Sequence, residues 1–423
     1  MTSKRNALSA NVLVFLVIGI VIGAAAVYAY MSSLAPNVVT STISPAAVEY
    51  KIGATLPLTG ELSSIGTQWK TVIEMALDEL NSQSTIHGMN VKFSLVELDD
   101  KTTPEGALKN VQSLYQSGMG VIIGPAGSSQ AKAVKSYVDE NKIVMLSPSS
   151  TAPTLAIPDD YIYRTVGSDV GQAAALAKMV ASQKSLSGSP IDTVVLFHRD
   201  DDYGIAFADF FTKEFAKYGG KAEDLKYAVG QADYASEVAQ LSSKVTSSQA
   251  DGVVIITYDT DGTNILSHAK DDAILSKVRW FSSEGIQGTK ELLNEPIGKF
   301  AQIVSLYGTR PLFRENPNYV AFVEQYKAKT GSDPPVFSAN IYDAIIIAGN
   351  AILDLGGQND GAALAAAIVN FANTYNGVSG PMAFDANGDK AAQDYGIWTI
   401  APSGSTYVYQ DIGSYSGGTL TLD

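Results

Sequence analysis

Two short stretches rich in hydroxyl side chains have the composition of an anion site. The first is GPAGSSQ, residues 124–130, and the second is SPSST, residues 147–151. Each follows a short apolar run typical of a buried strand. Ser128 and Ser129 also open a helical stretch, where free N–H groups and the helix dipole favour an anion. Together the two turns predict a site for a ligand carboxylate, although each alone is also explained by helix capping or an ordinary loop.

A carboxylate later in the chain could bind the opposite end of such a ligand. Glu284 lies in FSSEG, residues 281–285, at the end of another apolar run. Ligands of open α/β folds bind at the carboxyl ends of the strands. A desolvated carboxylate there could pair with an ammonium group, a bond worth roughly 1.5–3 kcal/mol. A solvated loop glutamate is the alternative that the residues leave open.

The stretch FHRDDDYG, residues 197–204, places three aspartates after a predicted strand. Such oxygens could hold a divalent cation. We expect no metal site, because no second acidic cluster has ligand spacing and the three histidines are scattered. Tyr203 lies where the loop enters a helix, so its ring faces either a cleft or the core.

Composition excludes several classes of function. The 423-residue chain has no cysteine, which rules out disulfides, zinc–thiolate sites and thiol nucleophiles. Its net charge of −14 argues against nucleic acid as a partner. Motifs of phosphate-binding loops, dinucleotide folds, serine hydrolases and zinc proteases are missing. We therefore expect a protein that is not an enzyme and uses no cofactor.

The first residues predict a membrane-targeting segment. Lys4 and Arg5 precede an apolar run, residues 11–30, of about the length that crosses a bilayer. The positive-inside rule then leaves the rest of the chain outside the membrane. Residues 1–31 are either a cleaved signal peptide or a retained anchor, and the length favours the anchor. The uncharged Ser, Thr, Pro and Ala residues of 32–47 indicate a linker, or a segment without function.

From residue 50 onward, strand-like apolar runs alternate with amphipathic helices. Strands alternating with helices predict a parallel sheet covered on both faces. Two such series predict two lobes. The second series ends at a strand predicted over residues 302–307. Three helices then follow, predicted at residues 316–330, 338–355 and 362–375, before a final β segment.

Several motifs occur in an order that resembles one family. They are IGATLPLTGELSSIG, VIIGPAGSSQ, IVMLSPSSTAPTL, YIYRTVGSDVGQ, VVLFHRDDDYG, WFSSEG, NIYDAIIIA and GPMAFDANGD. The chain resembles the extracytoplasmic solute-binding proteins of branched-chain amino-acid ABC transporters over about residues 50–412. The resemblance implies the two-lobed α/β type I periplasmic-binding fold, closing on a ligand. The lobes would be residues 48–168 with 309–393, and residues 169–308 with 394–423.

The resemblance also implies the residues of a ligand site. By position, Ser128 would bind the carboxylate, Ser149 would contribute backbone groups, and Thr151 would bridge carboxylate and ammonium. Glu284 and Gly285 would receive the ammonium. Two tyrosines and two side-chain-pocket residues complete the set: Tyr203, Tyr258, Ile65 and Phe337.

The implied partners are a small amino acid, branched-chain or similar, and ABC permease subunits with their ATPases, with the membrane reached through the amino-terminal helix. The alternative is a receptor for amides or urea-like solutes that signals through a separate protein.

Overall fold

The computed structural model describes residues 47–86, 89–313 and 316–423. The expected signal or anchor segment, residues 1–31, and the linker up to residue 46 lie outside these ranges. Within the described ranges, no helix combines the length and apolar character needed to cross a membrane.

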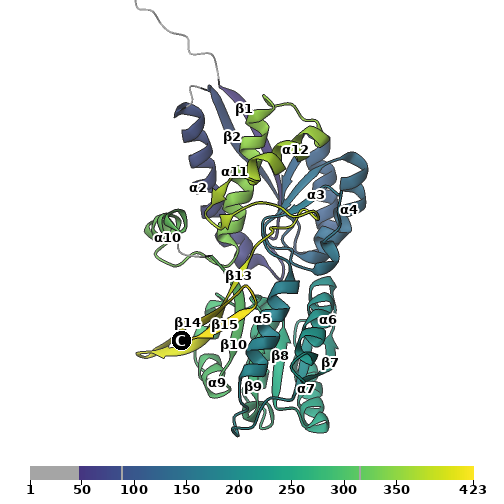
Figure 1. Ribbon diagram of the computed structural model, residues 1–423, viewed down its shortest axis with the longest axis vertical. Coiled ribbons are helices and arrows are strands. Elements are labelled where there is room, and N and C mark those ends of the chain that lie inside the picture. The colour runs from purple at the N-terminus through teal and green to yellow at the C-terminus, as the bar shows by residue number, and fades with distance from the viewer. Residues whose placement is uncertain (1–46, 87–88, 314–315) are drawn as a thin grey trace, which may run out of the picture. The chain divides into compact units, whose positions relative to one another are not determined.

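The first lobe is built on a parallel sheet with strand order β2-β1-β3-β4-β5. Helices α2, α11 and α12 pack together, and α3 packs against α4 (Figure 1). The elements of this lobe are β1 (Val48–Leu56), α2 (Ser63–Ile86), β2 (Val91–Asp99), α3 (Pro104–Gln116), β3 (Val121–Ile123), α4 (Ser128–Asn141), β4 (Val144–Ser147), a 3₁₀ turn (Pro153–Leu155), β5 (Ile162–Arg164), α10 (Pro317–Thr330), α11 (Ser338–Asp354), α12 (Gly361–Ala372), β11 (Asn376–Gly377) and β12 (Gly380–Pro381).

Helix α2 illustrates how the apolar spacing builds this lobe. Trp69, Val72, Ile73, Ala76 and Leu80 recur on one helical face and are all buried. This is the stripe expected of a helix that covers a sheet. Because the stripe seats α2 against the sheet, the first turn of α2 is fixed above the carboxyl ends of the strands.

The second lobe carries a mixed sheet with strand order β15-β14-β13-β10-β9-β8-β6-β7. Strands β6 to β10 are parallel, and the last three strands add an antiparallel edge. The elements are α5 (Asp169–Ser182), β6 (Thr193–Arg199), α6 (Asp202–Ala216), β7 (Lys221–Tyr227), α7 (Ala235–Ser248), β8 (Gly252–Ile256), α8 (Asp259–Ala269), a 3₁₀ turn (Leu275–Lys277), β9 (Arg279–Ser282), a 3₁₀ turn (Lys290–Leu293), α9 (Ile297–Ile303), β10 (Tyr307–Leu312), β13 (Asp394–Ser403), β14 (Thr406–Ser416) and β15 (Thr419–Leu422).

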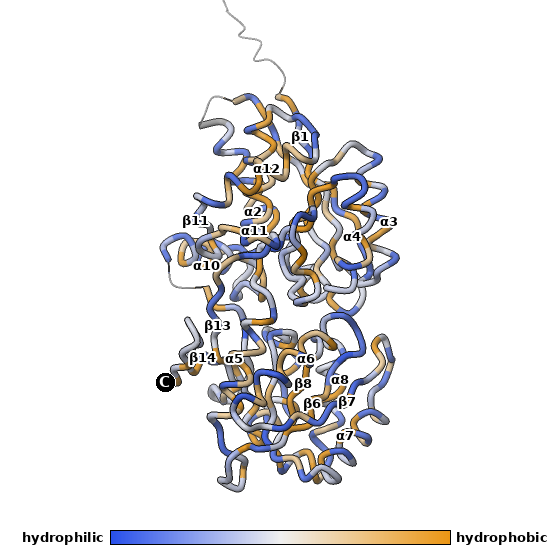
Figure 2. The backbone as a smooth tube through the Cα atoms, turned by 45° about the vertical axis from the view of Figure 1, so that its right-hand side comes forward, coloured by the Kyte–Doolittle hydropathy of each residue, from blue (hydrophilic) through white to orange (hydrophobic). Residues whose placement is uncertain are grey.

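Both faces of this second sheet are covered, as the continuous apolar strands predict. Along β6, Val194 and Leu196 pack into the same core as α5 and α6. The alternate residues Val195 and Phe197 pack into the core that includes α7, α8 and α9. The inner strands β6 and β8 therefore carry hydrophobic residues in succession, and hydrophobic residues are orange in Figure 2.

The chain passes between the lobes after β5, between β10 and α10, and before β13. Strand β10 keeps the chain in the second sheet through Leu312, which is beyond the boundary expected between residues 308 and 309. Each passage lies next to the carboxyl ends of strands in one lobe or the other. The two rows of strand ends therefore face one another across the junction of the lobes.

One predicted strand is wrong. Residues 302–307 do not form a strand, because Gln302 and Ile303 end α9 and the strand begins only at Tyr307. Val304 and Leu306 are buried in the turn between the two elements. Short apolar runs do not distinguish a strand from a buried helix end. Strand β5 and helix α8 are additional elements that the sequence patterns did not predict.

Candidate ligand-binding site

A cavity lies where the strand ends of the two lobes meet. Its lining is largely apolar and carries a few polar groups, which is typical of small-molecule sites. All nine residues expected at the site line it: Ile65, Ser128, Ser149, Thr151, Tyr203, Tyr258, Glu284, Gly285 and Phe337. The remaining lining residues are Leu62, Ser64, Gln68, Ala126, Asp259, Gln287, Gly288, Thr289, Pro335 and Val336.

The start of α4 forms the first-lobe side of the cavity. Gly127 occupies the cap position and Ser128 is the first helical residue, so Ser128 does not cap the helix. Its hydroxyl instead accepts a hydrogen bond from the backbone N–H of Ala152, at 3.2 Å. This bond ties the two hydroxyl-rich turns together. The helix N-terminus and the serine thus face the cavity from the position that suits an anion.

A buried ion pair between Arg164 and Asp389 supports the second turn, and the sequence patterns did not predict it. Arg164 donates through Nη1 to the carbonyls of Ser150 and Ala152, at 3.1 and 2.9 Å. Its other nitrogens pair with both carboxylate oxygens of Asp389. Ser149 donates to the carbonyl of Ala126, at 3.0 Å. These contacts fix the turn that carries Thr151; the arginine among apolar residues in YIYRT was the available signal.

Glu284 is the second lobe's contribution, directly after β9. Tyr203 donates its hydroxyl to Oε1 at 3.1 Å, and Gln172 donates Nε2 to Oε2 at 2.5 Å. Gln172 is itself anchored at 3.2 Å to Thr309. Glu284 is buried, and burial raises its pKa to about 7. A carboxylate in this position is stabilised by any cation that enters the cavity.

Asp169, at the start of α5, is a second buried carboxyl group near Glu284. Burial, followed by the charge of Glu284, raises the pKa of Asp169 well above its usual range, while Thr151 and Arg164 oppose the shift. The backbone N–H of Asp169 donates to the carbonyl of Thr151 at 2.9 Å. Because two neighbouring carboxyl groups in a dry environment disfavour each other's ionisation, the negative charge of this pair resides mainly on Glu284.

The residue after Glu284, Gly285, is a glycine for a steric reason. A Cβ at this residue would lie 1.9 Å from the carbonyl oxygen of Thr257. Only glycine lets the chain pass this close to the end of β8. The close passage keeps Glu284 aimed into the cavity.

Two stacked tyrosines form one wall. The rings of Tyr203 and Tyr258 lie 5.3 Å apart at an angle of 12°. The guanidinium of Arg199 lies 3.9 Å above the centre of the Tyr258 ring. Among the described residues that line the cavity, the apolar ones are Leu62, Ile65, Ala126, Pro335, Val336 and Phe337, and none is lysine or arginine.

Asp259 adds a carboxyl group at the junction of the lobes. Ser64 of α2 donates its hydroxyl to this group. Burial raises the pKa of Asp259 to about 6. This contact joins the first turn of α2 to the first turn of α8 across the cavity.

The aspartates of residues 200–202 have other partners. Asp201 accepts from the N–H of Gly204, which caps α6, and pairs with Arg199. Asp200 pairs with Lys226, and Asp202 pairs with Lys132. Across the described part of the chain, no group of three or more acidic or histidine side chains is arranged to hold a metal ion.

Comparison with known proteins gives a consistent result. Residues 49–405 match the family model of the periplasmic binding protein. An uncharacterized protein of Methanocaldococcus jannaschii is 27% identical, over 84% of this chain and 87% of its own length. A Leu/Ile/Val-binding protein of Rhizobium johnstonii is 25% identical, over 82% of this chain and 90% of its own length.

A solved structure shares the same architecture. It is an ABC transporter substrate-binding protein from Desulfitobacterium hafniense in complex with Leu, 25% identical, with a TM-score of 0.66. The match covers 86% of this chain and 100% of that one. The resemblance inferred from the sequence is therefore confirmed, and so is the two-lobed fold.

Proposed function

Since this chain belongs to the periplasmic binding protein family, we propose that it binds a branched-chain or similar amino acid outside the cytoplasmic membrane and delivers it to an ABC permease. The lobes would close on the ligand, and the permease would recognise the closed form. The proposal includes an amino-terminal segment that anchors the protein or is cleaved from it. It assigns no catalytic step and no cofactor.

The proposal that the ligand is a zwitterion rests on one observation. A buried carboxylate, Glu284, faces a cavity whose opposite side offers hydroxyls and a helix N-terminus at Ser128 and Thr151. In our proposal the ammonium binds to Glu284 and Tyr203, and the carboxylate binds to Ser128 and Thr151. A charge-assisted bond at each end favours a ligand that carries both charges.

The rest of the lining supports an aliphatic side chain. Leu62 lies just before α2, Ile65 lies in its first turn, and Val336 and Phe337 precede α11. Apolar surface buried against such a wall contributes roughly 25 cal/mol per Å². The names of the relatives, which include Leu/Ile/Val-binding proteins, favour this ligand class over amides or urea-like solutes.

A thermal-shift series with the purified protein tests the proposal. The series contains leucine, its decarboxylated amine and its deaminated acid. A ligand that binds the folded state raises the unfolding midpoint. We expect leucine to raise the midpoint and each analogue, which lacks one charge, to have little effect at equal concentration. Equal shifts for all three compounds would exclude a zwitterion site.

A further inference from the structure

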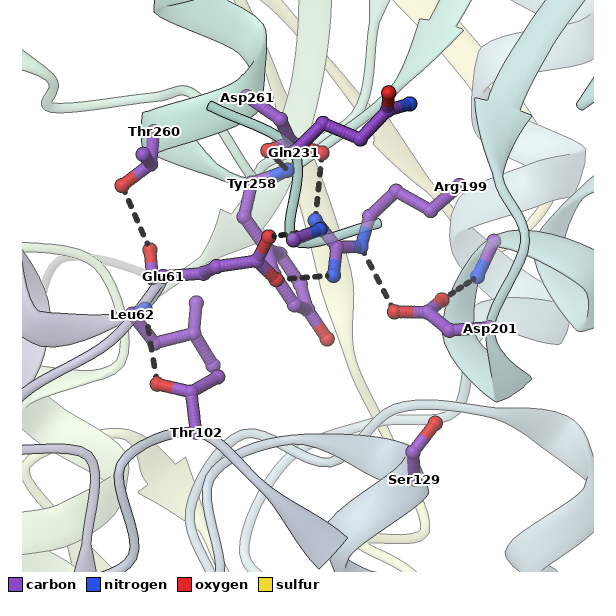
Figure 3. A network of polar contacts seen from close by, with 12 residues as sticks. Glu61, Leu62, Thr102, Ser129, Arg199, Asp201, Gln231, Tyr258, Thr260 and Asp261 are labelled. Atoms are coloured by element: carbon purple, nitrogen blue, oxygen red, sulfur yellow. Dashed lines mark hydrogen bonds and ion pairs between the residues drawn. The ribbon is translucent and has the colours of Figure 1, made fainter. Parts of the chain in front are cut away.

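Glu61 lies in the first lobe, just before α2, yet it contacts the second lobe in three ways (Figure 3). Its Oε2 accepts from Nη2 of Arg199 at 2.7 Å. Its Oε1 accepts from the backbone N–H of Gly230 at 2.9 Å, and its carbonyl accepts from the hydroxyl of Thr260 at 3.2 Å. Separating the lobes would break all three contacts.

Arg199 receives Glu61 in a position already fixed by its own lobe. Its Nε donates to Asp201 at 2.8 Å, and its Nη1 donates to Asp261 at 2.6 Å. The side chain of Arg199 is 2% exposed. Arg199 thus keeps two carboxylate partners when the lobes separate, and Glu61 adds a third when they meet.

Arg199 and Asp261 also position Tyr258, which forms part of the cavity wall. Arg199 lies over the ring of Tyr258, and Asp261 accepts from the backbone N–H of Tyr258 at 2.9 Å. Tyr227 also donates its hydroxyl to Asp261. A continuous set of contacts therefore leads from Glu61 through Arg199 to the tyrosine ring that faces the cavity.

We propose that Glu61 is a positioning residue that latches the lobes together around a bound ligand and fixes Arg199 against Tyr258. This inference rests on the proposed function. Ser128 and Thr151 are each 2% exposed and Glu284 is 4% exposed, so a ligand enters or leaves only when the lobes separate. Contacts present only in the closed form raise affinity by increasing its population. They do so mainly by slowing ligand release.

The test compares Glu61→Gln with Glu223→Gln. Glu223 is the matched control, since it pairs with Lys221 and Lys244 within the second lobe. Stopped-flow measurements give the association and dissociation rates of leucine, isoleucine or valine. For Glu61→Gln we expect dissociation about tenfold faster and association nearly unchanged, because one charge-assisted bond of the closed form is lost. The control should match the wild type.

Ionic strength provides a second readout that a purely structural role would not change. Added salt weakens a partly exposed ion pair, and Glu61 is 22% exposed. The ligand affinity of the wild type should therefore fall with added salt more steeply than the affinity of Glu61→Gln. Without ligand, the two proteins should unfold at the same temperature. If the wild type binds an amino acid and Glu61→Gln releases it at the wild-type rate, the latch is refuted while the proposed function is not. A wild-type protein that binds no amino acid would overturn the proposed function as well.

Discussion

Glu284→Gln removes the charge proposed to bind the ammonium while retaining the shape of the side chain. The amide oxygen can accept from Nε2 of Gln172, as the carboxylate does now. The amide nitrogen can donate to the hydroxyl of Tyr203, because a hydroxyl both donates and accepts. The variant should therefore fold with the same contacts, and any change in affinity reports on the charge.

The size of the effect follows from the burial of the carboxylate. A hydrogen bond to a desolvated charge contributes about 1.5–3 kcal/mol, so its loss weakens binding about ten- to 150-fold. In the ligand-free protein, by contrast, the same substitution is expected to leave the stability of the fold unchanged or to increase it. Burial raises the pKa of Glu284 from its ordinary 4.5 to about 7, and ionising it in the folded protein costs roughly 3 kcal/mol. The variant without ligand should thus unfold at the same temperature as the wild type or higher.

Calorimetry at about pH 8 is the suitable assay, because the carboxylate is then ionised with and without ligand. Glu97→Gln is the matched control. Glu97 lies on β2, is half-buried with a raised pKa, and is not among the residues that line the cavity. We expect the control to bind like the wild type. An unchanged affinity for Glu284→Gln, or an equal loss in both variants, would refute the assigned role.

Three further outcomes are expected. Ammonium binding needs ionised Glu284, so wild-type affinity should fall by up to tenfold per pH unit below about 7, and calorimetry should show a flat profile for Glu284→Gln. In the same titrations Ser128→Ala should weaken binding less than Glu284→Gln, because backbone donors at the helix N-terminus remain; an equal or larger loss would contradict this ranking. Arg164→Met leaves Asp389 buried without its partner and should lower the free energy of unfolding by roughly 3–5 kcal/mol in urea denaturation. Adding Asp389→Leu should restore part of that loss.

The sign of the pH effect on the ligand-free protein is also determined. The folded-state pKa of Glu284 lies above its unfolded value, so the folded state binds the proton more tightly between them. The stability that this provides is complete below about pH 4.5 and is lost as the pH rises through about 7. Ligand binding opposes this loss because it favours the ionised form.

Most of the fold follows from local patterns. The 3.6-residue spacing on α2 and the proline that begins α3 identify these helices without tertiary information. Residues 302–307 were assigned wrongly because Val304 and Leu306 are buried through packing in a turn, which leaves the same apolar pattern as a strand. Helix α8 begins with a polar stretch, and its cap depends on Asp261, whose second role is to bind Arg199.

The site follows from the sequence only in part. Resemblance and hydroxyl-rich turns indicated the nine lining residues, and the structure brings them together; their contact with a ligand stays a prediction. Gln172 and Asp169 were missed because they sit behind Glu284, in a helix whose sequence shows only a capped start. The link between Glu61 and Arg199 spans 138 positions and depends on how the lobes meet. No local pattern contains that information.

A crystal structure of the protein with leucine would show the position and orientation of the ligand at once. We expect one leucine between the lobes, with its carboxylate within hydrogen-bond distance of Ser128 and Thr151 and its ammonium within hydrogen-bond distance of Glu284. A leucine bound in the reverse orientation, or bound elsewhere while these three side chains contact no ligand, would contradict it.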